Sequence, residues 1–591
     1  MSPAEKPRAG ATFAFGLAAV MLCLFRLVLQ LRLPVFGRPA SIEDDMLMAS
    51  YADAIRKGEW LGAYSERALE KFPGHGVFLA FADWLGIPYM LALGIFWVLA
   101  AVVFLAAMRR WRAGRWVSLA AFSVVLFSPV MLQTHAQRLY LMASVPPTIL
   151  LLVSSFMVQA APGAPRFRWE KWLYAGLASL SAGYYAVLRQ DAIWVLALLA
   201  LLFLVFAFQG FWDFLRDGRR VRSLALCLVR AALPLAAYAA ASLSLSAANY
   251  ARYGVWMKSD FTEGGFARAC LSLMSIRPDE ERPLVYVSES TIRKAFAESP
   301  ALRRLEARYD ERREKRPIGM MANREWEREF YAWQLRWSAA SAGVYAKGAP
   351  YADGYFRQVA DEIDAAVREG RLAKRDAVLL SPFTGPLTGT RFWRIVRHSL
   401  KCGLMHTVTY RGLRPVFAVA KINGGRDEAH LSVMEDIAHA AIPSSRDGRS
   451  AAFRNSRYRA GVACGEKVSR LYQATGAAVA VAALAVFSAG WLCLLFARSC
   501  RGDRSLWCIM LFSTAMLAAS WMVAFIVSAN FFELFPDSTN IAYTAGAVPP
   551  WHVFCACTLL LLAPDLVRRL AASGLFARLR TVLARTTSGR A

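Results

Sequence analysis

The chain has 591 residues, of which 57% are hydrophobic and 19% charged, and its apolar residues lie in long runs separated by short Arg-rich breaks. This composition is typical of a protein that spans a membrane and argues against an ordinary soluble enzyme. The formal net charge is +27, but the basic residues are dispersed in short clusters between apolar runs, as topology determinants are, so we exclude a nucleic-acid partner.

Apolar windows of about 20 residues, long enough to cross a bilayer as helices, recur along the chain. They lie near 11–31, 89–108, 116–132, 139–161, 172–188, 192–212, 224–248, 474–497, 506–530 and 542–564. The sequence therefore predicts an all-α polytopic membrane protein with about ten transmembrane helices. The first window carries Arg26 and has no small-residue cleavage site before Arg32, so we interpret it as a retained anchor and not as a signal peptide.

Arg-rich loops predict the orientation, because one follows every second apolar window. They are RRWRAGR (109–115), RFRWEK (166–171), RDGRRVR (216–222) and RSCRGDR (498–504). By the positive-inside rule these loops face the cytoplasm, together with the N-terminus and a basic tail over 567–591. We therefore expect a multi-pass protein of the bacterial inner membrane.

The predicted organisation has four parts. They are an N-terminal transmembrane module over 1–250 with a first periplasmic loop at 32–88, a periplasmic domain over 251–473, C-terminal transmembrane helices over 474–566, and the basic tail. Helical spacing of apolar residues predicts helices over 325–345 and 351–372, the first with an aromatic stripe that we expect in the core. Short runs at 283–288 and 406–421 predict a few strands.

Cys270, Cys402 and Cys464 lie in the exported region, where one disulfide could persist, but the sequence does not choose the pair. The ten cysteines show no CxxC or other metal-ligand spacing.

The first periplasmic loop opens with three acids, Glu43, Asp44 and Asp45, just beyond the first apolar window. One interpretation is structural, because acids at the start of a helix complement its dipole, and Ser41 is a suitable N-cap. The other is catalytic. A carboxylate on the outer rim of a helical bundle deprotonates an acceptor hydroxyl within about 3 Å when low polarity or a neighbouring acid raises its pKa.

The order of motifs resembles that of the membrane-embedded C-type (GT-C) glycosyltransferases, which include the protein O-mannosyltransferases and the lipid A aminoarabinose transferase. The paired acids, the Gly-Asp/Glu-Trp turn and the Lys-Pro of that family correspond to Asp44 and Asp45, to Gly58-Glu59-Trp60, and to Lys71 with Pro73, although Phe72 separates the last two. The resemblance covers about 11–250. The exported segment is similar to that of uncharacterised bacterial membrane proteins with the same first loop.

The resemblance implies a polyprenyl-phosphate-sugar donor and therefore cations at the outer face of the membrane. Arg138 and Arg189 lie at outer turns, and a guanidinium donates two parallel bonds to a phosphate; the alternative is that these side chains only reach for water or lipid phosphate. In this hypothesis Asp44, helped by Asp45, accepts the proton of a hydroxyl on a glycan, lipid or protein. The enzyme is then an inverting hexosyl- or pentosyltransferase.

Other residues are secondary candidates for substrate binding. They are Lys71, Tyr64, His75 and Asp191, with Asn540 and Tyr543 at the outer start of the last window, where packing is the alternative. Asp191 is a partner for Arg189, although residues i and i+2 do not share a helix face. A lone loop histidine such as His75 is more often solvated.

The sequence indicates no certain cofactor. A divalent cation, Mg²⁺ or Mn²⁺, on Glu43, Asp44 and Asp45 is an alternative use of the acids, since some relatives need one, but no second acidic cluster completes such a site. The competing functions are a transporter or flippase of a lipid-linked saccharide and a membrane scaffold. Transporters usually show repeated halves with broken helices, which this order of spans does not form.

Overall fold

The structure, a computed structural model, describes residues 9–161, 167, 169–191, 193–216, 221–282, 284–314, 321–322, 325–445, 457–531, 533 and 541–572. Helices dominate these residues. The strands found in the described ranges are β1 (Met321–Ala322) and β2 (Glu325–Trp326), which form one antiparallel pair. The protein is therefore an all-α polytopic membrane protein, as the sequence predicts.

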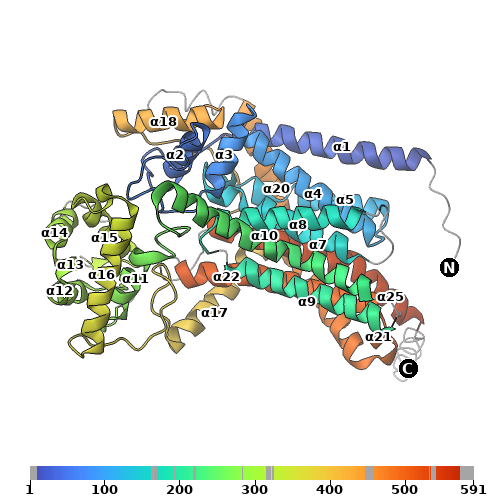
Figure 1. Cartoon of the computed structure of the whole chain (residues 1–591). Coiled ribbons are helices and arrows are strands. Elements are labelled where there is room, and N and C mark those ends of the chain that lie inside the picture. Colours follow the sequence, from blue (N-terminus) through green and yellow to red (C-terminus); the bar gives the residue numbers. More distant parts are fainter. Residues whose placement is uncertain are drawn as a thin grey trace, which may run out of the picture.

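Eight helical stretches in the described part of the chain are long and apolar enough to cross a membrane. They comprise α1 (Ala9–Leu31), α4 (Tyr89–Arg110), α7 (Val145–Ala160), α9 (Ile193–Arg216), α10 (Val221–Tyr253), α20 (Arg457–Phe496), α22 (Arg504–Phe531), and a last stretch built from α24 (Val548–Ala556), a π-helical turn (Cys557–Leu562) and α25 (Ala563–Ala572). The other two windows form α5 (Arg115–Leu126) and α8 (Glu170–Leu188), which pack on α4 and between α7 and α10 (Figure 1). Together they account for the ten apolar windows of the sequence.

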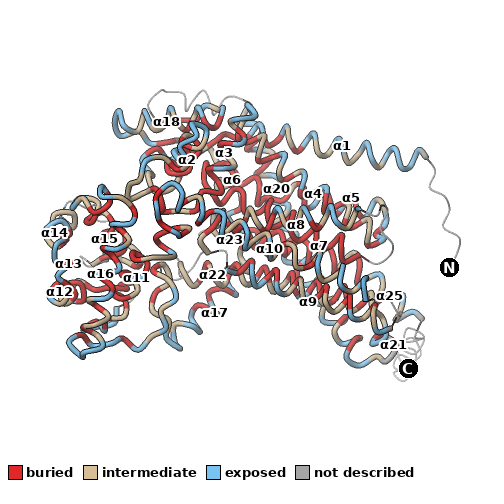
Figure 2. The backbone as a smooth tube through the Cα atoms, in the orientation of Figure 1, coloured by how far each residue is buried: buried red, intermediate tan, exposed pale blue. Residues whose placement is uncertain are grey.

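Helix α1 lies along one side of the bundle, and most of its residues are exposed, as in a helix that faces lipid (Figure 2). Near its end Leu29, Gln30 and Arg26 are buried, and the Arg26 side chain is fully buried. Its guanidinium donates to the carbonyls of Leu126 at 3.0 Å and Met131 at 3.2 Å, where α5 and the turn after it end. The arginine thereby satisfies helix-end carbonyls that have no partner within the helix.

The segment between α10 and α17 (Gly389–Gly403) contains a helical domain with a hydrophobic core of its own, separate from that of the bundle (Figure 2). Its helices are α11 (Gly264–Ser275), α12 (Glu289–Glu298), α13 (Pro300–Arg303), α14 (Glu306–Glu314), α15 (Phe330–Ser341) and α16 (Ala349–Arg368). The two helices predicted from spacing are thus confirmed as α15 and α16. The aromatic stripe packs in the core, as expected: Trp326 is buried, and the ring of Trp333 lies 4.7 Å from that of Phe261.

The strands predicted at 283–288 and 406–421 are wrong for the residues described there, which form turns, a π-helical turn (Leu404–Val408) and extended chain. Ala420 makes only an isolated bridge with Ser444. The physical reason is that a strand needs a neighbouring strand for its backbone groups, whereas these segments pack singly on helices. No disulfide forms among the described residues.

After the domain core ends at Leu372, the chain returns to the bundle. Helix α17 (Gly389–Gly403) packs along α22, and α18 (Gly425–Ala438) packs on α2 (Asp45–Arg56) (Figure 1). Helix α20 then begins at Arg457 and runs for 40 residues. At 1.5 Å per residue it is about 60 Å long, twice the thickness of the hydrocarbon core, so part of it projects beyond the membrane.

Candidate functional site

The acids of the first loop lie where α2 begins. Asp44 is the N-cap residue and Asp45 the first helical residue, but the Asp44 side chain makes no capping hydrogen bond. Its carboxylate instead contacts cationic side chains from other segments. Helix capping therefore does not explain why an acid stands at position 44.

Asp45 is fully buried and paired with Arg138. The Arg138 Nε donates to Asp45 Oδ2 at 2.8 Å and lies 2.6 Å from Oδ1, and the backbone N–H of Arg38 donates to Oδ2 at 2.9 Å. Burial raises the pKa of Asp45 to about 6, against the lowering effect of Arg138. This carboxylate ties the first loop to the segment after α6 (Thr134–Gln137), and it has no exposed surface for a substrate.

Asp44 is the accessible member of the pair, with 35% of its side chain exposed. The Lys71 Nζ donates to Oδ1, and the Arg138 Nη2 donates to Oδ2 at 3.3 Å. Burial acts to raise the pKa of Asp44, but Lys71 and Arg138 outweigh it and lower the pKa to about 2. The sequence argument expected a raised pKa in the base, whereas here the raised value belongs to Asp45 because the two cations stabilise ionised Asp44.

Tyrosines connect the two arginines that the sequence singles out. The Arg138 guanidinium lies 4.6 Å from the ring centre of Tyr140, and the Tyr140 hydroxyl lies 3.5 Å from the Lys71 Nζ and within hydrogen-bonding reach of Tyr543. The Arg189 guanidinium lies 5.8 Å from the ring centre of Tyr543. The structure thus brings Asp44, Lys71, Arg138 and Arg189 into one polar cluster, which we call the outer cluster and which includes both tyrosines.

Tyr140 is the member of the outer cluster that sequence reasoning missed. Arg138 and Tyr140 both have extended backbone conformations in the structure, and residues i and i+2 of an extended segment face the same side. The sequence alone did not show that this stretch leaves the helical conformation.

Arg189 is buried and already paired. Its Nε donates to Asp191 Oδ1 at 2.5 Å, its Nη2 donates to Asp191 Oδ2, and its Nη1 lies 2.9 Å from the sulfur of Met142. Each arginine therefore has a carboxylate partner in this structure. A phosphate that binds here exchanges with a carboxylate and does not enter an empty clamp.

His75 does not lie in a solvated loop. It is fully buried in the first turn of α3 (Gly74–Trp84), with its Nδ1 2.9 Å from the Ser144 Oγ, and burial lowers its pKa to about 3. The expectation of a solvated histidine is therefore wrong. Tyr64 lies in an aromatic group, with its ring 5.7 Å from that of Tyr253 and 6.2 Å from that of Tyr345. Neither residue is placed in contact with the outer cluster.

The Gly58-Glu59-Trp60 turn holds the loop against the bundle. Gly58 and Trp60 both have positive φ, +75° and +58°, so the chain reverses sharply. The indole Nε1 of Trp60 then donates to the Asn249 side chain at 2.9 Å, near the end of α10.

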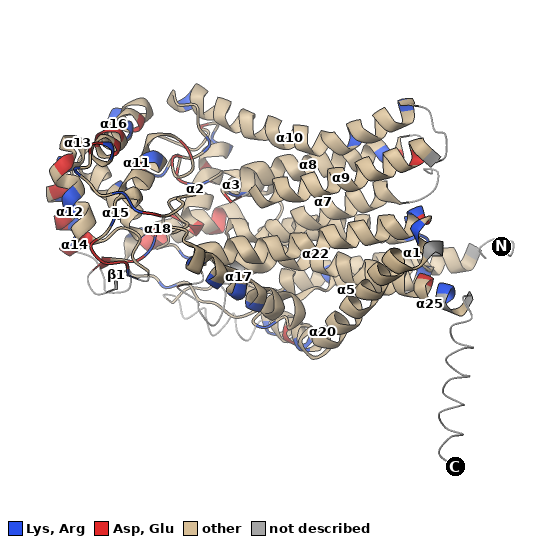
Figure 3. Cartoon of the chain, turned by 90° about the horizontal axis from the view of Figure 1, so that it is seen from below, with Lys and Arg blue, Asp and Glu red and all other residues tan. Residues whose placement is uncertain are grey.

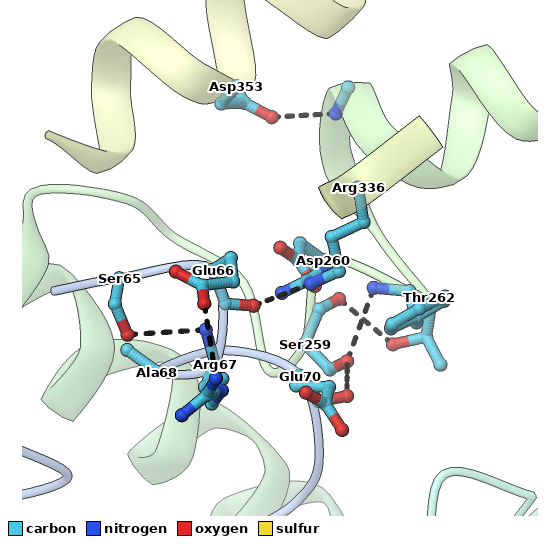
Figure 4. Close-up of polar contacts among 12 residues, drawn as sticks. Ser65, Glu66, Arg67, Ala68, Glu70, Ser259, Asp260, Thr262, Arg336 and Asp353 are labelled. Carbon is cyan, nitrogen blue, oxygen red and sulfur yellow. Dashed lines mark hydrogen bonds and ion pairs between the residues drawn. The ribbon is translucent and has the colours of Figure 1, made fainter. Parts of the chain in front are cut away.

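The helical domain fixes the segment that carries Lys71 (Figure 4). Arg336 of α15 is fully buried; its Nε donates to the Glu66 carbonyl at 2.5 Å, and its Nη1 donates to Asp260 at 2.9 Å. The Ser259 hydroxyl donates to the Glu70 carbonyl at 3.0 Å, directly before Lys71. The position of Lys71 in the outer cluster therefore depends on contacts from the domain.

No group of three or more His, Cys, Asp or Glu side chains in the described ranges is arranged to hold a metal ion. Asp44 and Asp45 are occupied by Lys71 and Arg138. Asn540, the remaining candidate, lies outside the described residues.

The fold and the outer cluster define a class: an all-α polytopic membrane protein in which an accessible carboxylate of the first long loop contacts one cation of that loop and one of a later segment. No family model matches the chain, and no curated protein sequence matches it. Among solved structures, the crystal structure of ArnT from Cupriavidus metallidurans bound to undecaprenyl phosphate is similar over 93% of this chain and 78% of that chain, with 12% identity and a TM-score of 0.26. At this TM-score the similarity supports no argument about the site.

Proposed function

We propose that this chain transfers a sugar from a polyprenyl-phosphate donor to an acceptor hydroxyl at the outer face of the membrane. The observation that supports the proposal is the accessible, ionised Asp44 held between Lys71 and Arg138 in the loop that leaves the first span. A transfer of this kind needs a proton acceptor near cations that stabilise a phosphate, and the outer cluster contains both.

In the proposed reaction the acceptor oxygen attacks the anomeric carbon from the face opposite the phosphate. The bond from that carbon to the phosphate oxygen breaks, the configuration inverts, and the hydroxyl proton passes to Asp44. The departing polyprenyl phosphate gains one negative charge. Lys71, Arg138 and Arg189 are the cations that stabilise this charge as it develops.

Donor binding also provides a way to activate the base. Asp44 has a pKa of about 2 when Lys71 and Arg138 interact with its carboxylate and no donor phosphate shares them. A donor phosphate that shares these cations weakens their hold on the carboxylate, so the pKa of Asp44 rises toward its ordinary value and the carboxylate becomes a stronger base. The low pKa in the free protein is therefore compatible with general base catalysis in the complex.

Mass spectrometry of lipid-linked sugars and surface glycans, in a deletion strain and its parent, tests the proposal. The deletion strain should accumulate a polyprenyl-phosphate sugar and lack one sugar in a glycan. The parental gene should restore that sugar, and Asp53→Asn, a change of a partly exposed side chain in the last turn of α2, should do the same. The rate of sugar transfer by Asp44→Asn should be lower by a factor of about 100 or more, the usual scale for loss of a general base.

A flippase would also leave a lipid-linked sugar behind when deleted, so the purified chain provides the decisive measurement. Transfer releases free polyprenyl phosphate, whereas transport leaves the donor intact. No release from the accumulated donor, or release at the parental rate by Asp44→Asn, would contradict the proposed function.

A further inference from the structure

A second polar feature lies at the opposite end of the bundle from the outer cluster. Residues at the end of α7, the start of α8, the last part of α9 and the starts of α10 and α22 line a cavity of about 260 Å³. Figure 3 shows basic residues at those ends of α9 and α10 that lie far from the helical domain. This cavity is separate from the outer cluster and shares none of its residues.

The charge of the cavity wall is positive. Lys171, Arg230 and Arg504 line it, and Asp213 is the one carboxylate among its lining residues. Arg504 forms an ion pair with that carboxylate. Its Nε lies 2.6 Å from Oδ1, and its Nη2 donates to Oδ2 at 2.9 Å. Arg230 pairs with no carboxylate in the described part of the chain, and its guanidinium lies 5.9 Å from the ring centre of Trp172. The lining residues therefore include three cations and one carboxylate, so their net formal charge is positive.

Gln159 adds an independent observation. It lies in the last turn of α7, lines the cavity, and is only 5% exposed. Neither its side-chain oxygen nor its nitrogen has a hydrogen-bond partner among the described residues. A buried amide without partners costs about 1–3 kcal/mol, so such a group is normally satisfied by water or a ligand.

We propose that this cavity binds a phosphate group, with Lys171 and Arg230 supplying charge and the Gln159 amide donating a hydrogen bond. A guanidinium and an ammonium are the usual protein partners of phosphate. The volume is far larger than the roughly 30 Å³ of one water molecule and just below the range of about 300–1,000 Å³ typical of drug-sized ligands. It therefore suits a headgroup or a free ion and not a complete lipid-linked saccharide.

Two sources provide this chemistry, an anionic phospholipid and inorganic phosphate. Phe206, Leu224 and Leu226 form an apolar part of the same wall, which a lipid would contact with the start of its acyl chains. The experiment therefore compares dihexanoyl phosphatidic acid, inorganic phosphate and dihexanoylglycerol, which has the same chains but no phosphate.

The measurement is the shift of the thermal unfolding midpoint of the full chain, purified in detergent without phospholipid, as each probe is titrated. Phosphatidic acid should stabilise the parent, and dihexanoylglycerol should not. Half-saturation at a lower concentration of phosphatidic acid than of inorganic phosphate assigns the site to a lipid headgroup. Equal values assign it to the free ion, and both results support a phosphate site.

Arg230→Gln should raise the concentration of phosphatidic acid needed for half-saturation about tenfold or more, the effect of losing a charge-assisted hydrogen bond. Gln159→Glu keeps the volume of the side chain but places a carboxylate against the phosphate, so it should abolish the shift even if Arg230→Gln does not fold. Arg222→Gln, an exposed change in the first turn of α10 outside the cavity, is the matched control.

An equal shift with dihexanoylglycerol would overturn the proposal, because the phosphate would then contribute nothing. So would parental binding by both Arg230→Gln and Gln159→Glu, or no shift with either phosphate probe. None of these readouts depends on sugar transfer, so the cavity and the proposed function can fail separately.

Discussion

The two adjacent acids differ in their surroundings, because Asp45 is buried in an ion pair and Asp44 is accessible. The change Asp45→Asn tests the structural role of the buried one. Asp45 is fully buried against Arg138, and removing one partner of a buried ion pair typically costs about 3–5 kcal/mol. Two contacts reduce the cost here: an asparagine oxygen still accepts from the Arg38 N–H, and Asp44 lies 3.3 Å from the same guanidinium. We therefore expect Asp45→Asn to destabilise the protein by about 2–4 kcal/mol.

Thermal unfolding of the purified protein in one detergent measures this change, with the monodisperse fraction after heating as the readout. For a chain of this length a loss of this size corresponds to a midpoint lower by about 2–3 °C, because the entropy of unfolding grows with the number of residues. The control is Asp53→Asn on the same helix, because Asp53 forms a partly exposed pair with Lys57 that is worth about 1 kcal/mol or less. The double variant Asp45→Asn with Arg138→Gln should lose less than the sum of the single changes. Equal midpoints for Asp45→Asn and Asp53→Asn would refute the reasoning.

Three further predictions follow from burial and charge. Burial lowers the pKa of His75 to about 3, while an unfolded histidine titrates near 6.5. Between these two values only the unfolded state binds the proton, so the stability of the folded state falls as the pH drops below about 6.5. His75→Gln should therefore lose about 2 kcal/mol less than the parent between pH 7 and pH 5, and an equal loss in unfolding midpoint would contradict this. Arg336→Met leaves a buried carboxylate unpaired and should speed hydrogen exchange in the segment before Lys71, measured by mass spectrometry, while the bundle keeps its protection. Reporter fusions at Gly114 and Gly502 should indicate the cytoplasm and a fusion at Gly348 the outside; any reversed sign would contradict the orientation.

The spans could be predicted because a transmembrane helix depends on local properties, namely about 20 apolar residues and the charges at its ends. The same reasoning could not predict the backbone conformation of residues 406–412, because their composition favours a strand and the structure has none there. Tyr410 has a positive φ of 50°, and its hydroxyl lies 3.0 Å from the His552 Nε2. Its ring also packs on Tyr472, 5.2 Å away. Contacts with helices distant in the chain decide the conformation here, and local propensity does not.

Most members of the outer cluster could be predicted from the sequence, with Tyr140 as the exception, whereas the pKa values of its acids could not. Loop position and residue type pointed to Asp44, Asp45, Lys71, Arg138 and Arg189, all of which the structure brings near one another. Which acid becomes buried depends on Arg138, which lies 93 residues from Asp45 in the chain. The sequence therefore could not predict that the pKa of Asp45 is raised while that of Asp44 is lowered.

The pairing of Arg189 with Asp191 depends on where helix α8 ends, because the backbone conformation decides whether residues i and i+2 face the same side. On a helix, residues i and i+2 point to different sides, so this pair seemed poorly placed. Helix α8 ends at Leu188, and Arg189 has an extended backbone with φ −136° and ψ 140°. In an extended segment residues i and i+2 face the same side, so one carboxylate accepts two donors of the guanidinium. Because Asp191 already accepts from the two donors with which Arg189 would hold a phosphate, the proposed donor binding at this arginine would require an exchange of one anion for another.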